Sequence, residues 1–169
     1  MLHDIVRDFG HLTLGTRLRR VGEMLQANTQ QIMQAHGVDL PAAHYPFLAA
    51  LDRNGALSVG ELADVIGITQ PGATRTIGQL AEAGFVEIAA SETDQRRKQV
   101  TLTESGEKLV AFAKENIWPG VEAAVRDMCT GLEGSFLDQL AAIEDGLKKH
   151  PLIERYNSKN EPPSDRKQT

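Results

Sequence analysis

The densest group of chemically active side chains in this 169-residue sequence is a short basic run, Arg96-Arg97-Lys98, preceded by Asp94. Guanidinium and ammonium groups suit phosphate oxygens, because they combine positive charge with several N–H donors. A more isolated arginine, Arg75, could donate two parallel hydrogen bonds to guanine O6 and N7 or to a phosphate. A carboxylate close to phosphates weakens binding unless it is paired, so Asp94 is expected to orient an arginine. These residue types therefore point to a phosphate-bearing partner.

The segment before the basic run predicts two short helices joined by a tight turn. Ser58-Val59-Gly60-Glu61 has the spacing of a capping box, so a helix should begin at Ser58 and end at Gly67. Thr69 and Pro71 form a second start signal, followed by apolar residues three and four apart. Two short helices around a glycine-containing turn are typical of a helix-turn-helix.

After Gly84 the hydrophobic period changes from helical to alternating. Residues 85–88 and 99–102 predict two strands with a polar segment between them, which places the basic run at the tip of a hairpin. Thr103 is then expected to cap a long helix that is kinked at Pro119, because proline removes one hydrogen bond and clashes with the preceding turn.

Further helices are predicted on both sides of this region. One spans Leu14–Ala35 and is stopped by Gly37. Another follows Asp39-Leu40-Pro41 and ends at Asn54-Gly55, and a last one runs from Ser135 to His150-Pro151. The polar residues 157–169 include no apolar side chain and are predicted to be a disordered tail. The expected fold class is mainly α with a small β-hairpin (α+β), in a single domain over residues 1–156.

The net charge of −5 argues weakly against a nucleic-acid partner, but the charge is unevenly distributed. Residues 69–103 hold four basic and four acidic side chains, whereas residues 104–156 hold six and ten. The excess acidity therefore belongs to the C-terminal helices, and the region with the basic run is locally neutral.

The remaining composition indicates a globular domain in the cytoplasm. Hydrophobic residues make up 41% of the chain, and no stretch reaches the roughly 18 apolar residues of a membrane span. Asp4, Arg7 and Asp8 interrupt what would have to be the apolar part of a secretory signal. The lone Cys129 excludes an intramolecular disulfide and is expected to be a buried small hydrophobe.

The segment from Leu80 to Gly106 resembles the multiple antibiotic resistance regulator (MarR) family of winged-helix transcription factors. The resemblance is carried by Leu-Ala-Glu-Ala-Gly-Phe-Val and by Asp-Gln-Arg-Arg-Lys-Gln-Val-Thr-Leu-Thr-Glu-Ser-Gly, and the helix order fits from about Leu12 to Lys149. It implies a winged helix-turn-helix at about 38–103 and dimerisation helices at about 1–36 and 104–156. It also implies a homodimeric DNA-binding regulator, in most cases a repressor, on a pseudo-palindromic operator.

Site residues follow from this resemblance. DNA contacts are expected from the helix residues Gln70, Pro71, Thr74 and Arg75 and from the wing residues Arg96, Arg97 and Lys98, with Asp94 orienting an arginine. A small anionic or aromatic effector is expected between the dimerisation helices and the winged domain, near Arg17, Arg20, His44, Tyr45 and Phe47. The two arginines lie three residues apart, as a carboxylate clamp requires, although a solvated or dimer-bridging basic edge would have the same pattern.

Other functions have less support in the sequence. It contains no Gly-rich phosphate loop, Gly-x-Ser-x-Gly elbow or His-Glu-x-x-His helix, so an enzyme is not expected. His3, Asp4 and His11, or His36 with His44, form no dense ligand set, and neither a metal nor another cofactor is expected. The alternatives are a winged-helix module that binds protein and a redox- or metal-responsive regulator of the same fold.

Overall fold

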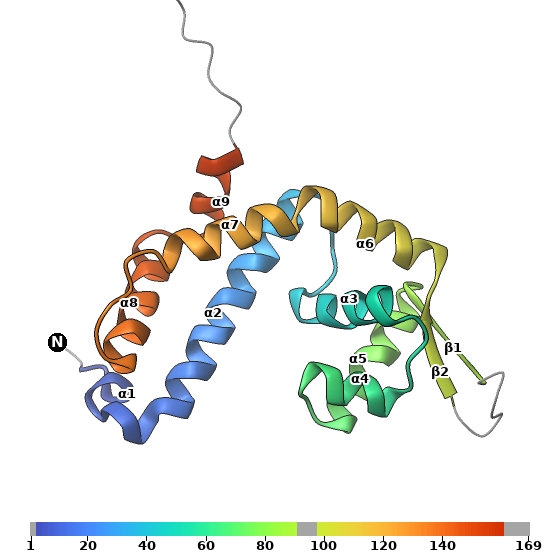
Figure 1. Ribbon diagram of the computed structural model, residues 1–169, viewed down its shortest axis with the longest axis horizontal. Coiled ribbons are helices and arrows are strands. Elements are labelled where there is room, and N and C mark those ends of the chain that lie inside the picture. The colour runs from blue at the N-terminus through green and yellow to red at the C-terminus, as the bar shows by residue number, and fades with distance from the viewer. Residues whose placement is uncertain (1–2, 91–97, 161–169) are drawn as a thin grey trace, which may run out of the picture. The chain divides into compact units, whose positions relative to one another are not determined.

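The computed structural model describes residues 3–90 and 98–160, which are mainly helical and contain one two-stranded antiparallel sheet (Figure 1). The predicted fold class is therefore confirmed. The chain forms two compact units, one of residues 1–42 and 117–169 and the other of residues 43–116. None of the helices in the described ranges is long and apolar enough to cross a membrane.

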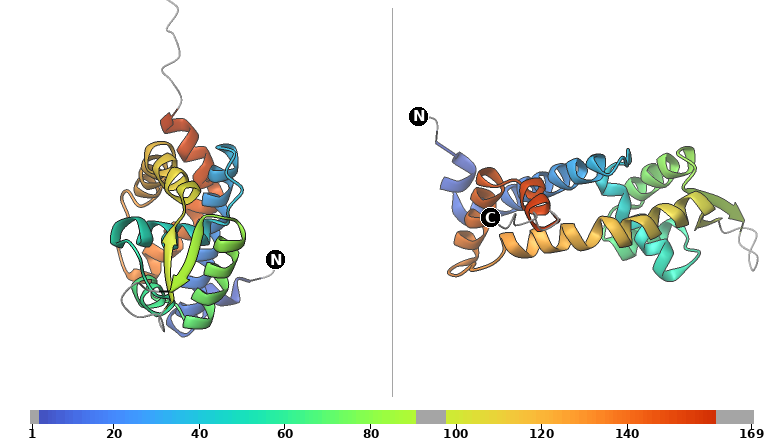
Figure 2. Two further views of the ribbon diagram at one scale, coloured as in Figure 1. Left: turned by 90° about the vertical axis from the view of Figure 1, so that its right-hand side faces the viewer. Right: turned by 90° about the horizontal axis from the view of Figure 1, so that it is seen from above.

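The second unit contains the predicted helix-turn-helix and hairpin. Its elements are η2 (Ala42–His44), α3 (Tyr45–Asn54), α4 (Val59–Ile66), α5 (Gln70–Glu82), β1 (Val86–Ala90), β2 (Lys98–Leu102) and α6 (Glu104–Asn116). The strands lie side by side with Val86 opposite Leu102, and Leu57 bridges the other edge of β2 (Figure 2). The core of this unit is formed by buried side chains from α3, α4, α5, β2 and α6. Among them are Leu48, Leu62, Ile77, Leu80, Val100 and Val110.

The start and stop signals of the helix-turn-helix act as predicted. Ser58 and Glu61 form both halves of a capping box at the start of α4, which ends at Gly67 in the left-handed conformation. Thr69 caps α5, and its hydroxyl accepts a hydrogen bond from the Gly72 amide. These caps satisfy backbone groups that a short helix would otherwise leave without partners.

The start of α3 differs from the prediction. The α-helix begins at Tyr45 after a short 3₁₀ turn, and Pro46, rather than Pro41, occupies its first turn. Leu40, which precedes Pro41, lies in a bend before η2 and is buried at 3% exposure.

The first unit is a group of packed helices. Its elements are α1 (Ile5–Asp8), η1 (Gly10–Thr13), α2 (Leu14–Ala35), α7 (Trp118–Met128), α8 (Phe136–Lys149) and α9 (Leu152–Asn160). The bounds of α2 agree with the prediction. Helix α9 was not expected, and it runs past residue 157, where the sequence predicts a tail. Residues 161–169 lie outside the described part of the chain.

The predicted long kinked helix is two helices. Helix α6 ends at Asn116 and α7 begins at Trp118, with Ile117 between them at φ −117° and ψ −56°. Pro119 lies in the first turn of α7, where its missing amide costs no hydrogen bond. The proline therefore starts a new helix instead of bending a continuous one.

Candidate nucleic-acid interface

Helix α5 has one buried face and one polar face. Ala73, Ile77 and Leu80 are at most 1% exposed, which fixes the rotation of the helix on the second unit. The residues predicted to contact DNA, Gln70, Pro71, Thr74 and Arg75, are all exposed. The arrangement is that of a recognition helix, with an anchored apolar side and an available polar side.

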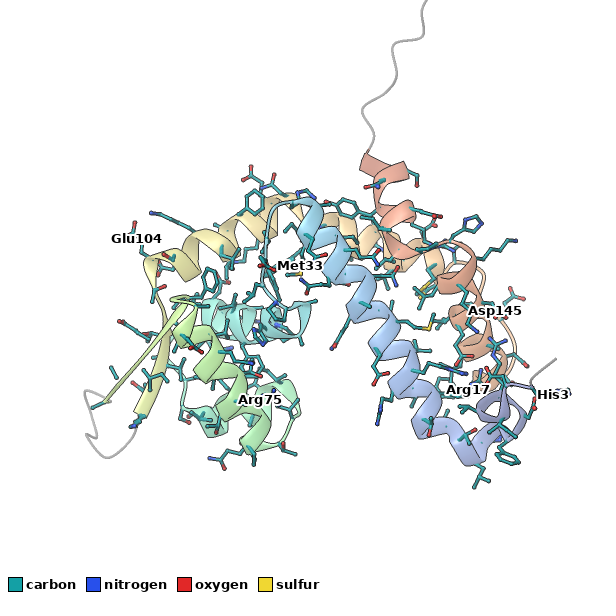
Figure 3. The ribbon with its side chains drawn as sticks, turned by 180° about the vertical axis from the view of Figure 1, so that it is seen from behind. His3, Arg17, Met33, Arg75, Glu104 and Asp145 are labelled. Atoms are coloured by element: carbon teal, nitrogen blue, oxygen red, sulfur yellow. The ribbon has the colours of Figure 1, made fainter. Side chains whose placement is uncertain are left out.

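Arg75 is available for an external partner. Its side chain is exposed and forms no ion pair with any residue in ranges 3–90 and 98–160, including Glu82 on the same helix (Figure 3). Thr74, in contrast, donates a hydrogen bond from its hydroxyl to the Gln70 carbonyl at 2.9 Å. The Thr74 oxygen can still accept a hydrogen bond from a base or approach a phosphate through its methyl group.

The two glycines in α5 have different surroundings. A Cβ on Gly72 would lie 3.2 Å from the Thr69 hydroxyl oxygen, so the glycine allows the cap to close tightly. A Cβ on Gly78 would meet nothing within 4 Å. Packing therefore explains Gly72, whereas no described neighbour of α5 requires Gly78.

The base of the wing is fixed by the Leu-Thr-x-x-Gly part of the sequence signature. The Thr103 hydroxyl donates to the Gly84 carbonyl at 2.6 Å and accepts from the Gly106 amide at 3.1 Å. A Cβ on Gly106 would lie 2.1 Å from the Phe85 carbonyl oxygen, so only glycine allows α6 to approach the start of the hairpin this closely. The motif thus joins α5, the hairpin and α6 at one point.

Only one of the wing residues predicted to bind DNA is described by the structure. Lys98 is exposed at the start of β2, where it pairs with Ala90 across the hairpin. Asp94, Arg96 and Arg97 lie outside the described residues. Their assignments as the orienting acid, the minor-groove arginine and a phosphate contact remain predictions.

Behind the recognition helix, two predicted effector residues carry buried polar atoms without partners. His44 and Tyr45 are each 8% exposed, and neither the His44 Nδ1 nor the Tyr45 hydroxyl has a hydrogen-bond partner among the described residues. Burial lowers the pKa of His44, although a hydrogen bond to Gln79 of α5 acts in the opposite direction. Burial raises the pKa of Tyr45 to about 12. Phe47 is a core residue at 2% exposure.

The predicted carboxylate clamp is already occupied by the protein itself. Arg17 and Arg20 both donate hydrogen bonds to Glu144 of α8, which is fully buried, and Arg20 also pairs with Asp4. In Figure 3, Arg17 and Asp145 mark this end of the first unit. The two arginines therefore bind an internal carboxylate, and the structure gives no support to their use as an effector clamp.

Sequence reasoning missed Glu144 and misplaced Cys129. The signal that could have found Glu144 is the set of arginines near the N-terminus, Arg7, Arg17 and Arg20, which need a common carboxylate on a neighbouring helix. Cys129 is exposed, contrary to the prediction of a buried side chain. It lies at the C-cap of α7, where the chain leaves the helix for the turn at residues 130–134.

Comparison with known sequences identifies the family of the winged part. Residues 38–97 match the model of the MarR family. This range begins before α3 and includes α4, α5 and β1, which together form most of the second unit.

Solved structures extend the similarity to most of the chain. BpsR of Bordetella bronchiseptica, whose DNA binding is regulated by 6-hydroxynicotinic acid, is 27% identical, with 80% of this chain and 91% of that chain covered and a TM-score of 0.59. MarR from E. coli, in a cysteine-to-serine variant bound to operator DNA, is 20% identical, with 87% and 98% covered and a TM-score of 0.63. The same protein without ligand is 21% identical, with 80% and 95% covered and a TM-score of 0.58.

These matches agree with the helix-turn-helix and with the wing base that Thr103 and Gly106 fix. Residues 38–97, the winged part of the chain, thus match the MarR family, and the solved structures extend the similarity in fold to most of the chain.

Proposed function

We propose that this protein is a homodimeric transcriptional repressor that binds a pseudo-palindromic operator and is released by a small effector. The observation that carries the proposal is the exposed Arg75, which has no ion-pair partner among residues 3–90 and 98–160, on an otherwise well-anchored helix α5. An arginine held on a rigid helix can donate two hydrogen bonds to a guanine edge in the major groove. Thr74 and Gln70 on the same face would contact neighbouring bases or phosphates.

The wing would add a second contact in the adjacent groove. Arg96 is proposed to enter a narrow minor groove and read its shape, while Arg97 and Lys98 neutralise phosphates. Two such domains in a symmetric dimer would read half-sites about one helical turn, roughly 10 base pairs, apart. Binding across a promoter would block transcription.

Dimerisation is supported by apolar side chains that the first unit leaves in solvent. Ile5, Phe9, Leu12, Leu18 and Phe136 are each at least 46% exposed. Large apolar side chains gathered on elements at one end of a unit mark an interaction surface more often than a solvated one. We assign a second copy of the chain to this surface.

Effector binding is supported by the buried polar atoms of His44 and Tyr45. A tyrosine hydroxyl and an imidazole nitrogen can together bind a carboxylate or a phenolic oxygen, and a buried polar atom without a partner costs about 1–3 kcal/mol. A small aromatic acid would supply the missing hydrogen bonds. Since His44 also contacts Gln79 of α5, such a ligand could alter the position of the recognition helix.

The test is DNA binding by the wild type and two arginine variants. Fluorescence anisotropy with the protein's own upstream region, or with a site selected from random DNA, should show specific binding. Arg75→Ala should weaken it by about 10- to 100-fold, the effect of losing one bidentate base contact. Arg126→Ala is the matched control, because Arg126 is an exposed arginine of α7 that pairs with Glu122.

Two results would contradict the proposal. The first is wild-type protein that binds no upstream or selected DNA at low salt. The second is equal loss of affinity in both arginine variants, which would indicate a general charge effect. In the same assay, small aromatic acids should release the complex, and Tyr45→Phe should reduce that release without weakening DNA binding.

A further inference from the structure

The N-terminal segment of residues 3–13, here called the strap, is attached to the first unit in an unusual way. It comprises α1 and η1, and neither element has a buried residue. Its large apolar side chains point into solvent: Ile5 is 57% exposed, Phe9 53% and Leu12 83%. Hydrophobic burial within one chain therefore does not explain why the strap is ordered.

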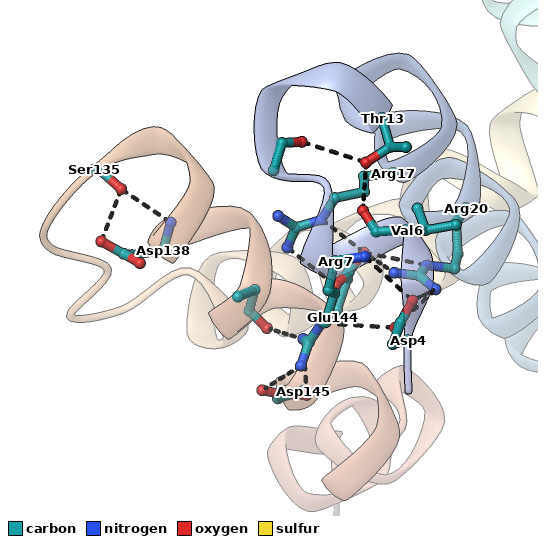
Figure 4. A network of polar contacts seen from close by, with 12 residues as sticks. Asp4, Val6, Arg7, Thr13, Arg17, Arg20, Ser135, Asp138, Glu144 and Asp145 are labelled. Atoms are coloured by element: carbon teal, nitrogen blue, oxygen red, sulfur yellow. Dashed lines mark hydrogen bonds and ion pairs between the residues drawn. The ribbon is translucent and has the colours of Figure 1, made fainter. Parts of the chain in front are cut away.

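Polar contacts to one buried acid hold the strap in place (Figure 4). Arg7 donates from Nε to Glu144 at 2.7 Å and from one terminal nitrogen to Asp145 and to the Ala141 carbonyl, both at 2.9 Å. The Thr13 hydroxyl closes the strap on itself by donating to the carbonyls of Val6 and Gly10. One side chain, Arg7, thus makes three separate attachments to α8.

The acid at the centre of this network is held by two further arginines. Arg17, only 3% exposed, and Arg20 donate to Glu144 from α2 at distances between 2.9 and 3.4 Å. Arg20 also reaches back to Asp4 of the strap at 3.0 Å. A buried carboxylate that accepts hydrogen bonds from three arginines has a fixed orientation, and the loss of any partner leaves charge uncompensated.

From these contacts we infer that the Glu144 cluster, formed by Asp4, Arg7, Arg17, Arg20, Glu144 and Asp145, holds the strap in place. It thereby positions the apolar surface of Ile5, Phe9 and Leu12, through which a second copy of the chain docks. The inference rests on the proposed dimer and names the residues that control it. Arg7, Glu144 and Asp4 are positioning residues, because none of them forms part of the apolar surface.

The charge balance of the cluster supports a second copy as the occupant. Three arginines, Arg7, Arg17 and Arg20, face three carboxylates, Asp4, Glu144 and Asp145. A surface with a large net charge would repel its own copy across a twofold axis. Here the three arginines balance the three carboxylates within the chain, so the cluster itself adds no net charge that a second copy would have to overcome.

The lock is also independent of pH near neutrality. Burial alone would raise the pKa of Glu144, but hydrogen bonds from Arg17, Arg7 and Arg20 outweigh it and lower the pKa to about 2. Hydrogen bonding to Arg20 likewise lowers the pKa of Asp4. Glu144 and Asp4 therefore stay ionised near neutral pH.

The experiment uses the full-length chain with Arg7→Met, which removes the attachments to α8 but leaves Glu144 with its two arginines from α2. Amide hydrogen exchange should become about tenfold faster in residues 3–13, and the dimer dissociation constant from analytical ultracentrifugation should rise about tenfold or more. Arg126→Met is the control, because it breaks an exposed pair on α7, whose described residues include no exposed large apolar side chain. It should change neither quantity.

A second variant tests the surface without touching the lock. Leu12→Gln replaces a solvent-exposed side chain, so folding should be unaffected while the dimer dissociation constant rises. Strap exchange that stays unchanged in Arg7→Met would overturn the lock. Faster exchange in the strap with an unchanged dimer dissociation constant would show that the Glu144 cluster does not position the docking surface. A wild type that is monomeric at micromolar concentration would refute the proposed dimer. In that case the exchange measurement would still show whether Arg7 holds the strap.

Discussion

At the scale of single residues, the packing of the second unit requires glycine where two backbone segments come into van der Waals contact. Gly106 lets α6 approach the Phe85 carbonyl, and Thr103 beside it satisfies groups on both sides of the wing base. Gly78, on the polar face of α5, has no such neighbour. The same residue type therefore has opposite consequences for stability at two positions of one unit.

This contrast can be measured with two glycine-to-alanine variants. Gly106→Ala should reduce the free energy of unfolding by about 1–3 kcal/mol, because the new methyl group would overlap a backbone oxygen. Gly78→Ala should increase it by up to about 1 kcal/mol through helix propensity. Urea denaturation without DNA checks both values, and equal effects of the two substitutions would contradict this account of the wing base.

Glu144 gives a pH-dependent prediction. Its folded-state pKa, about 2, lies below the ordinary value of 4.5, so its contribution to stability is complete above about pH 4.5 and is lost as the pH falls toward 2. At neutral pH, Glu144→Gln should lower the free energy of unfolding by about 3–5 kcal/mol, because three arginines lose their common partner. The difference from wild type should shrink between pH 4.5 and 2, as followed by urea denaturation at each pH. Glu154→Gln, a change at an exposed site on α9, should show no such convergence.

At the scale of elements, α9 is fixed by its contacts rather than by its own sequence. The Leu152 amide donates to Asn28 of α2 at 2.9 Å, and the Tyr156 hydroxyl hydrogen-bonds His36 at 2.6 Å. A Cβ on Gly120 of α7 would lie 2.0 Å from the Tyr156 ring, so this glycine provides the space in which α9 packs. The helix is short and polar on its outer side, and tertiary contacts stabilise it.

Gly120→Ala tests that packing. We expect a loss of about 1–3 kcal/mol in the free energy of unfolding and faster amide exchange in residues 152–160, since the ring of Tyr156 must move. Gly22→Ala in α2 is the control, because a Cβ at that position meets nothing within 4 Å. Unchanged exchange in α9 after the first substitution would show that Tyr156 does not anchor the helix.

At the scale of the whole molecule, the net charge of −5 coexists with a locally neutral winged region. A long-range attraction to DNA is therefore weak, and non-specific affinity should be modest. Under the proposed function, specificity would then depend on a few directed contacts repeated by two subunits. Under the same proposal, the Glu144 cluster and the exposed apolar side chains of the first unit would serve the association of the chain with its own copy.

The sequence by itself determined the local architecture. Capping signals at Ser58 and Thr69, the stop at Gly67 and the change of period after Gly84 act over a few residues, so the helix-turn-helix and hairpin could be predicted from neighbours in the chain. Only the tertiary structure decided which long-range partners the polar groups have. Arg17 and Arg20 bind Glu144, more than 120 residues away, and α9 depends on Asn28 and His36. Such pairings depend on which helices pack together, and local propensity carries no information about that choice.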